Sequence, residues 1–520
     1  MFGDFAKDEF NDGVGDWSVS AGMGYKENVL LNYLGFQETL RASNADSHFQ
    51  ITPPIELSRL ATEWEPQQAL ILSLSFAEAM EDLEIARNFA STLDVAHSYL
   101  DIYVFGDQEE HKDHAQLLSL LSNHPRIESI LAKTQFIDSR KLLRWSRDFG
   151  PIFGFGTDGQ LVTIDPVYRD MIKPLEEATL NIDEPLDPLR DLFNLHGDAM
   201  PSEVAATLQT EYDISVDIVR PPVSMDGGDF ISDGEGNVFV SRQTLVRNGG
   251  NRSELEKIFR SYFGARNLHI LEALPGRTVP HLDMILKFLD NETIVLPDFK
   301  DSAVKAVNPY HAELNRKARW AIDKNERYLR EHFPEYRILK IPMPPILFKG
   351  QEEIVAEAKQ AFVKAFALEK ELVGTDKINR LSNTQLVELE RQVLTAIKRE
   401  MPTADFSSFK AFDAVLRHYG QLGLDAYIDR YSEPVTRYRS YINSVFLHTE
   451  DGRQAFMAPR FTSSDPGESA LLKKWEAEVD KAYRTAWPEA KVYWINCDSM
   501  VSNLGFLHCA SVTVPLLERN

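Results

Sequence analysis

The stretch WSRDFGP at residues 145–151 sets the expectations for the rest of the chain. Gly-Pro after a charged pair is typical of a loop, so Asp148 is expected at a turn beside an aromatic residue, not on a solvated helix face. A carboxylate in that position can hold a cation. Taken alone, the stretch also fits a turn in which Arg147 and Asp148 form only local hydrogen bonds.

Two further segments combine carboxylates with unusual neighbours. In MDGGD at residues 225–229, two glycines allow close backbone approach next to Asp226, although the spacing does not match a calcium loop. In HLD at residues 281–283, an extended backbone would point His281 and Asp283 to the same side, which suits proton transfer beside a bound cation. A tight turn with solvated acids and a packed histidine are the structural alternatives.

The chain has two cysteines, Cys497 and Cys509. This number excludes a disulfide-built scaffold and is compatible with a reduced, working thiol in a cytoplasmic enzyme. Cys509 ends the stretch NLGFLHC at residues 503–509, just ahead of a predicted strand. Simple burial is the alternative for Cys509, and we expect it for Cys497, to which we assign no chemistry.

Short strands alternate with amphipathic helices along most of the chain, which predicts an α/β or mixed α+β fold. β-branched and aromatic runs with turn residues nearby predict strands at residues 70–74, 102–105, 216–219, 238–241, 293–297, 338–342, 492–495 and 511–514. Helices are expected at residues 77–91 and 254–263. DGEG at 233–236 and DG at 451–452 predict hairpin turns, because glycine accepts a positive φ.

Residues 346–436 differ from the rest because they hold consecutive helical patterns and little strand. Apolar residues recur at helical spacing on two faces: Ile354, Ala358, Phe362 and Phe366 on one, and Leu386, Leu389, Val393 and Ile397 on the other. Ser382 and Gln385 suggest a capping box before the second face. We predict an N-terminal extension (1–59), a catalytic domain (60–345 and 437–520) and a helical insertion (346–436); a helical part of the main core is the alternative for the last.

Composition restricts the class of partner. With 43% hydrophobic and 26% charged residues, no apolar run near the roughly 18–20 residues of a membrane span and no visible secretory signal, the sequence predicts a soluble, cytoplasmic protein without a membrane partner. The formal net charge of -23 repels nucleic-acid phosphates and suits a small cationic substrate, although acidity also serves solubility. Assembly into a homo-oligomer is left open.

Taken together, the segments resemble the agmatine deiminase and Porphyromonas-type peptidylarginine deiminase family of guanidine-modifying enzymes. The similar stretches stand in family order: EWEPQQA at 63–69, WSRDFGP at 145–151, DGG at 226–228 with DGEG at 233–236, HLD at 281–283, IPMP at 341–344, SYIN at 440–443 and LHC at 507–509. The family carries Glu in place of Asp226, Gly in place of Pro280, and a run of glycines in place of residues 502–505. The last two departures lie near the expected substrate site.

The resemblance implies a pentein α/β propeller with pseudo-fivefold symmetry, to which the helical insertion is added. It implies the following site: Cys509 as nucleophile, His281 as acid and base, Asp226 orienting His281, Asp148 and Asp283 clamping a guanidinium, and Trp145 and Arg147 as further substrate contacts. No metal or organic cofactor is implied. The implied reaction hydrolyses an agmatine- or arginine-like guanidino group to a ureido group and ammonia; amidino transfer and ligand binding without catalysis are the alternatives.

Overall fold

The protein is described by a computed structural model. The described residues are 51–74, 83–106, 125–139, 144–168, 197–212, 214–275, 281–299, 309–348, 351–374, 383–419, 436–501 and 505–517, together with residues 114, 118, 142, 378 and 381. Most of the predicted N-terminal extension and the start of the predicted helix at 77–91 therefore lie outside the described residues. Within the described part, no helix has both the length and the apolar character that a membrane crossing needs.

Five of the sheets repeat one pattern of three strands. In each, a first strand pairs antiparallel with a second, and the second pairs parallel with a third. The first strands are β5 (Ile152–Gly156), β8 (Phe230–Ser232), β11 (Lys287–Phe288), β16 (Val445–His448) and β19 (Ser511–Pro515). The second strands are β6 (Leu161–Ile164), β9 (Asn237–Ser241), β12 (Thr293–Phe299), β17 (Gln454–Arg460) and β2 (Gln67–Ser73). The chain is thus a mixed α/β protein built from a repeated unit.

Helices connect each second strand to its parallel third strand, as parallel pairing requires. The third strands are β7 (Val216–Val219), β10 (Asn267–Leu271), β13 (Arg337–Met343), β18 (Lys491–Asn496) and β3 (Asp101–Gly106). The connecting helices are α8 (Met200–Tyr212), α9 (Arg242–Arg247) with α10 (Arg252–Tyr262), α11 (Pro309–His332), α17 (Pro466–Ala486) and α3 (Leu83–Ala96). Two sheets carry a fourth strand, β1 (Leu57–Leu60) or β4 (Thr134–Asp138). The eight predicted strands all overlap observed ones.

Strand β2 is apolar on both faces because each face packs against an apolar cluster. Ala69 and Ile71 pack into one apolar cluster, whereas Leu70 and Leu72 pack into another. Because neighbouring side chains of a strand point to opposite faces, a strand covered on both faces needs a continuous apolar run. The two predicted hairpin turns are confirmed: Gly234 and Gly236 join β8 to β9 and Gly452 joins β16 to β17, all with positive φ.

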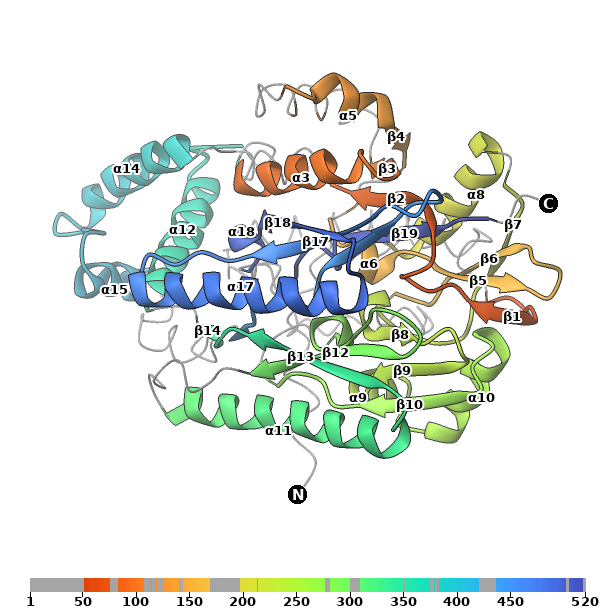
Figure 1. Ribbon diagram of the computed structural model, residues 1–520. Helices are drawn as coiled ribbons and strands as arrows, with labels where there is room; N and C mark the ends of the chain where they lie inside the picture. Colours follow the sequence, from red (N-terminus) through yellow and green to blue (C-terminus); the bar gives the residue numbers. More distant parts are fainter. Residues whose placement is uncertain are drawn as a thin grey trace.

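The segment with helical patterns contains α12 (Gln351–Glu369), α14 (Asn383–Glu400) and α15 (Phe409–His418). These helices share an apolar cluster of their own, in which Phe362 and Val393 are buried. Figure 1 shows the three helices grouped at one side of the sheets. The short strands β14 (Leu347–Phe348) and β15 (Thr436–Arg437) pair where the segment leaves and rejoins the rest of the chain. Ser382 of the predicted capping box and the side chain of Ile354 lie outside the described residues.

Candidate active site

The predicted site residues lie directly ahead of the first strands of the repeated units. Asp148, Asp226 and Asp283 each stand four residues before such a strand, which begins at Ile152, Phe230 or Lys287. In each case the aspartate lies in or directly before a short helical turn: Asp148 in α6 (Ser146–Phe149), Asp226 just before η3 (Gly227–Asp229) and Asp283 in η4 (Leu282–Met284). Asn443 and Cys509 stand two residues before β16 and β19. A polar side chain or a thiol therefore precedes the first strand of each of the five units, and the three aspartates share similar local structure.

The structure brings the thiol, the imidazole and the three carboxylates together. Side-chain ligand atoms of Cys509, His281 and Asp283 all lie within 4.8 Å of one another. Nε2 of His281 is 3.1 Å from Oδ2 of Asp226, and Nδ1 is 3.4 Å from Oδ1 of Asp148. All five residues are buried, with Cys509 and His281 each only 2% exposed. The meeting of these five residues, which are distant in sequence, is the central feature of the site.

His281 is held in its cationic form. Burial by itself lowers its pKa, but the charge of Asp148 and the hydrogen bond and charge of Asp226 outweigh burial, and the pKa rises well above its usual value. A proton on His281 at neutral pH is what a general acid needs.

Asp226 has a second partner that the sequence gave no reason to expect. Arg247, at the end of α9, donates from Nη1 to Oδ1 of Asp226 at 2.9 Å and from Nη2 to Oδ2 at 3.3 Å. This two-pronged ion pair fixes the plane of the carboxylate. Asp226 can therefore present Oδ2 to His281 in one orientation.

Asn443 holds Cys509 in place. Its Nδ2 donates to Sγ of Cys509 at 3.1 Å, and its Oδ1 accepts from the backbone N–H groups of His508 and Cys509 at 3.1 and 3.3 Å. The sequence pointed to Asn443 only as part of the family-like stretch SYIN, with no role attached. The amide therefore fixes both the sulfur and the backbone that carries it.

Asp283 has one oxygen in use and one open. Oδ2 accepts from Nδ1 of His508 at 2.7 Å and lies 3.5 Å from Sγ of Cys509. Oδ1 is buried and has no hydrogen-bond partner among the described residues. Burial alone would raise the pKa of Asp283, but His508, His281 and Arg147 lower it, so the group is an anion at neutral pH. A buried acceptor without a partner costs about 1–3 kcal/mol, more when charged, and such a group points to a ligand that supplies the donor.

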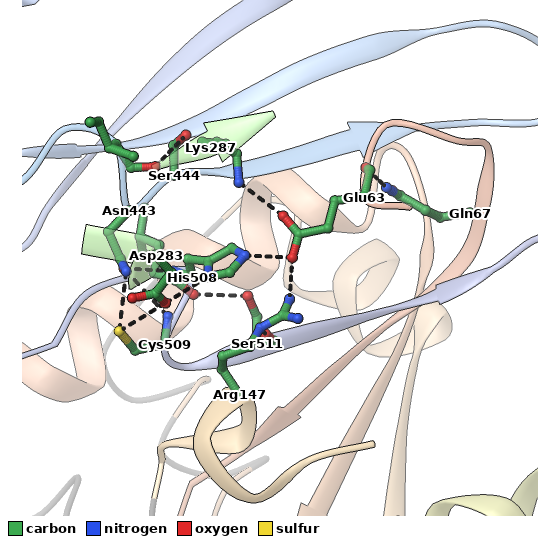
Figure 2. Close-up of polar contacts among 12 residues, drawn as sticks. Glu63, Gln67, Arg147, Asp283, Lys287, Asn443, Ser444, His508, Cys509 and Ser511 are labelled. Carbon is green, nitrogen blue, oxygen red and sulfur yellow. Dashed lines mark hydrogen bonds and ion pairs between the residues drawn. The ribbon is translucent and has the colours of Figure 1, made fainter. Parts of the chain in front are cut away.

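Arg147 and Trp145 lie next to this group. Arg147 donates from Nε to the carbonyl of Ser511 at 3.1 Å, and its Nη2 is 3.0 Å from Oε1 of Glu63. The indole of Trp145 packs directly against Gly505, where a Cβ atom would come within 2.5 Å of the ring. Figure 2 shows Arg147 turned toward Glu63 and Ser511. Pro280 and residues 502–504, where the chain departs from the family pattern, lie outside the described residues.

The same side chains are of types that bind divalent metals. His281, Asp283 and Cys509 would supply a nitrogen, an oxygen and a sulfur. Metal binding requires a neutral imidazole and a thiolate. The pKa values of both His281 and Cys509 are raised, which opposes both deprotonations. The electrostatics therefore favour an imidazolium beside a neutral thiol.

The sequence was also compared with known families and proteins. A family described as Porphyromonas-type peptidyl-arginine deiminase matches residues 59–515. The chain belongs to this family. Among curated proteins, none matches it.

Solved structures of several deiminases share the fold of this chain. An agmatine deiminase of C. jejuni is 15% identical with a TM-score of 0.51, over 88% of this chain and 95% of that one. An agmatine deiminase of Enterococcus faecalis gives the same four values. A proposed arginine deiminase of Porphyromonas gingivalis is 16% identical with a TM-score of 0.53, over 88% of this chain and 98% of that one. At such low identity the similarity shows the fold alone.

Gly228 lies against the imidazole of His281 in this deiminase-family chain. A Cβ atom at this position would lie 2.6 Å from Nδ1 of His281 and 3.3 Å from Oδ2 of Asp283. Gly228→Ala is therefore expected to displace the ring and lower kcat/KM by about 10- to 100-fold, with a smaller effect on Tm. Steady-state kinetics and thermal unfolding measure the two effects.

Gly374 offers the matched control, because a Cβ atom there meets nothing within 4 Å. Gly374→Ala should leave both kinetics and Tm unchanged. Equal activity of the two alanine variants would show that His281 does not need its observed position.

The thiol of Cys509 is expected to be protonated in the free enzyme. Burial raises its pKa to about 12, together with the charges of Asp283 and Asp148 and against the opposing effect of His281. Alkylation of Cys509 by neutral iodoacetamide should therefore be slow at pH 7 and rise about tenfold per pH unit up to pH 10. Mass spectrometry of the labelled peptide measures the rate. A plateau with a midpoint below pH 7 would show instead a preformed thiolate.

Proposed function

We propose that this protein is a deiminase that hydrolyses the guanidino group of an agmatine- or arginine-like substrate to a ureido group and ammonia. The observation that carries the proposal is a buried imidazolium, His281, with four buried groups around it: Asp148 and Asp226 lie 3.4 and 3.1 Å from its ring nitrogens, and Asp283 and the thiol of Cys509 lie within 4.8 Å. A guanidinium is planar and cationic, and its carbon is a poor electrophile. Its hydrolysis needs carboxylates to hold the cation, a strong nucleophile and an acid for the departing amine.

In the first step, Asp148 and Asp283 bind the guanidinium nitrogens. The open Oδ1 of Asp283 is a ready acceptor for one N–H group, in a charge-assisted hydrogen bond. The positive charge of the substrate also offsets the carboxylates that raise the pKa of Cys509. Substrate binding thus favours release of the thiol proton to solvent, which leaves the reactive thiolate while His281 keeps its own proton. Direct contacts of Trp145 and Arg147 with the substrate remain predictions.

In the second step, the Cys509 thiolate attacks the guanidinium carbon and forms a C–S bond. The C–N bond to one terminal nitrogen then breaks, and the nitrogen leaves as ammonia with a proton from His281. A thiouronium group remains attached to Cys509. Asp226, itself fixed by Arg247, keeps the His281 ring in the orientation that this transfer needs.

In the third step, the now neutral His281 takes a proton from a water molecule, which attacks the same carbon. The C–S bond then breaks, the hydroxyl proton of the adduct passes to solvent, and the ureido product leaves. The thiolate is regenerated and takes a proton back from solvent, while His281 is again protonated. The sequence of steps requires no metal or organic cofactor. Amidino transfer would follow the same first two steps, with an amine in place of the water.

We also infer that the five three-strand units are arranged as a pentein propeller, with the site at its centre. The equal placement of Asp148, Asp226 and Asp283 ahead of their strands supports a pseudo-symmetric arrangement. In this view residues 60–345 and 437–520 form the catalytic domain, 346–436 a helical insertion, and 1–59 an N-terminal extension. The separate apolar cluster of α12, α14 and α15 supports the division.

A product assay tests the function. Purified protein is incubated with agmatine, arginine, methylated arginine and an arginine-containing peptide, and the ureido product and ammonia are measured. Equal amounts of both products from one substrate, with no added amine, are expected. Ammonia release only in the presence of an amine acceptor would indicate amidino transfer, and ligand binding without any product would indicate a binding protein.

A further inference from the structure

His508, the residue before Cys509, lies between the carboxylates of Asp283 and Glu63 and is within hydrogen-bond distance of both. Nδ1 of His508 is 2.7 Å from Oδ2 of Asp283, and Nε2 is 2.6 Å from Oε1 of Glu63. The pKa of each carboxyl group is lowered, so both are anions and can only accept hydrogen bonds. Each ring nitrogen of His508 therefore faces a carboxylate oxygen at hydrogen-bond distance. Figure 2 shows this ring between the two carboxylates.

Glu63 is anchored independently of His508. Its Oε2 lies 3.0 Å from Nζ of Lys287, and its Oε1 lies 3.0 Å from Nη2 of Arg147. Burial alone would raise the pKa of Glu63, but His508, Lys287 and Arg147 hold that pKa well below its usual value. Protonation of Glu63 is therefore unfavourable, and a proton relay through His508 to Glu63 is disfavoured. The contacts instead suit a fixed connection, in which His508 joins Asp283 to Glu63 without transferring a proton.

The imidazolium of His281 competes with His508 for the carboxylate of Asp283. A ring nitrogen of His281 lies within 4.8 Å of both that carboxylate and the sulfur of Cys509. A freely rotating Asp283 would turn toward this imidazolium and lose the open oxygen. The strong bond from His508 to Oδ2 prevents the rotation, and Oδ1 stays buried without a partner among the described residues.

We propose that His508 is a positioning residue: it holds Asp283 by one oxygen, braced against Glu63, so that the other oxygen receives the guanidinium of the substrate. Asn443 accepts from the backbone N–H groups of both His508 and Cys509, so the brace and the nucleophile are held by one side chain. The proposal rests on the proposed deiminase function. It makes His508 a determinant of cation recognition that acts through Asp283 and does not itself contact the substrate.

Two variants of His508 separate its two contacts. In His508→Asn the side-chain amide reaches roughly the place of Nδ1 and can still donate to Asp283, whereas in His508→Gln it reaches roughly the place of Nε2 and can donate only to Glu63. The readout is the ratio of the alkylation rates of Cys509 by cationic 2-chloroacetamidine and neutral iodoacetamide, followed on the labelled peptide. For an active substrate, KM and kcat are measured alongside.

In the His508→Gln variant the alkylation ratio is expected to fall about tenfold or more, with KM rising more than kcat falls. The ratio for His508→Asn should remain nearer to the wild-type value. Glu63→Gln keeps the shape of the brace but removes its charge, and should lower the ratio by a smaller factor. His269→Gln is the control: His269 is a partly buried histidine whose Nδ1 lies 2.8 Å from the hydroxyl of Tyr328, away from the site.

A wild-type alkylation ratio in folded His508→Gln would overturn the role assigned to His508. An equal loss in His508→Asn and His508→Gln would do the same, since only one of them lacks a donor to Asp283. The deiminase proposal fails separately, through absence of ureido product from the wild-type protein. The labelling ratio needs no turnover and is measured in either case.

Discussion

Cys509→Ala is expected to abolish ureido production, with a fall in kcat of roughly 10⁴-fold or more, while a guanidino ligand still binds. The variant removes the protein atom that, in the proposed mechanism, forms a bond to the substrate carbon. The carboxylates of the site keep their partners, among them Arg247 on Asp226 and His508 on Asp283. Product assays give the first value, and calorimetry with the best substrate gives the second.

Cys497→Ala is the matched control, since Cys497 is the other buried thiol and lies in the apolar core. It should retain activity, with a modest loss of stability from the lost packing. Turnover by Cys509→Ala comparable to that of Cys497→Ala would end the proposal of a cysteine nucleophile.

Asp283→Asn is expected to change two reactions of Cys509 in opposite directions. The variant loses a charge-assisted bond to the substrate, and kcat/KM should fall about 10²- to 10³-fold, or roughly 3–4 kcal/mol. The negative charge of Asp283 is also one of the main causes, after burial, of the raised pKa of Cys509. Its removal should lower that pKa and accelerate alkylation by iodoacetamide at pH 8.

A fall in kcat/KM together with faster alkylation of Cys509 distinguishes a charge effect from general distortion. Distortion would slow turnover without this specific rise in the reactivity of Cys509. Asp158→Asn is the control, because Asp158 is exposed and accepts a hydrogen bond from the local backbone N–H of Gln160. It should alter neither rate. If Asp283→Asn is alkylated more slowly than the wild type by the neutral reagent, the electrostatic account of the thiol is wrong.

The repeated three-strand unit explains why several carboxylates of one chain lie in one site. Each first strand is preceded by a turn that can carry a polar group, and three of these turns carry an aspartate at the same distance from the strand. This recurrence is present in the sequence, as an aspartate four residues ahead of a short strand. It was not recognised in the sequence analysis because β5, β8 and β11 were not among the predicted strands.

Local features of the protein were legible from the sequence. Strands such as β2 and β12 and the hairpin at Gly234 follow from residue type and spacing, since side-chain alternation and positive φ are properties of a few adjacent residues. The helices α12, α14 and α15 follow from apolar spacing in the same way. Cys509 and His281 became candidates through the order of the family-like stretches.

Only the tertiary structure decided how the charged groups are paired. Arg247 binds Asp226, Glu63 binds His508 across most of the length of the chain, and one oxygen of Asp283 is left open. These pairings depend on how separate sheets pack, and no local pattern of residues encodes that packing. The sequence thus specified which groups are present, whereas the packing of the repeated units determined which of them neutralise each other and which remain available for a substrate.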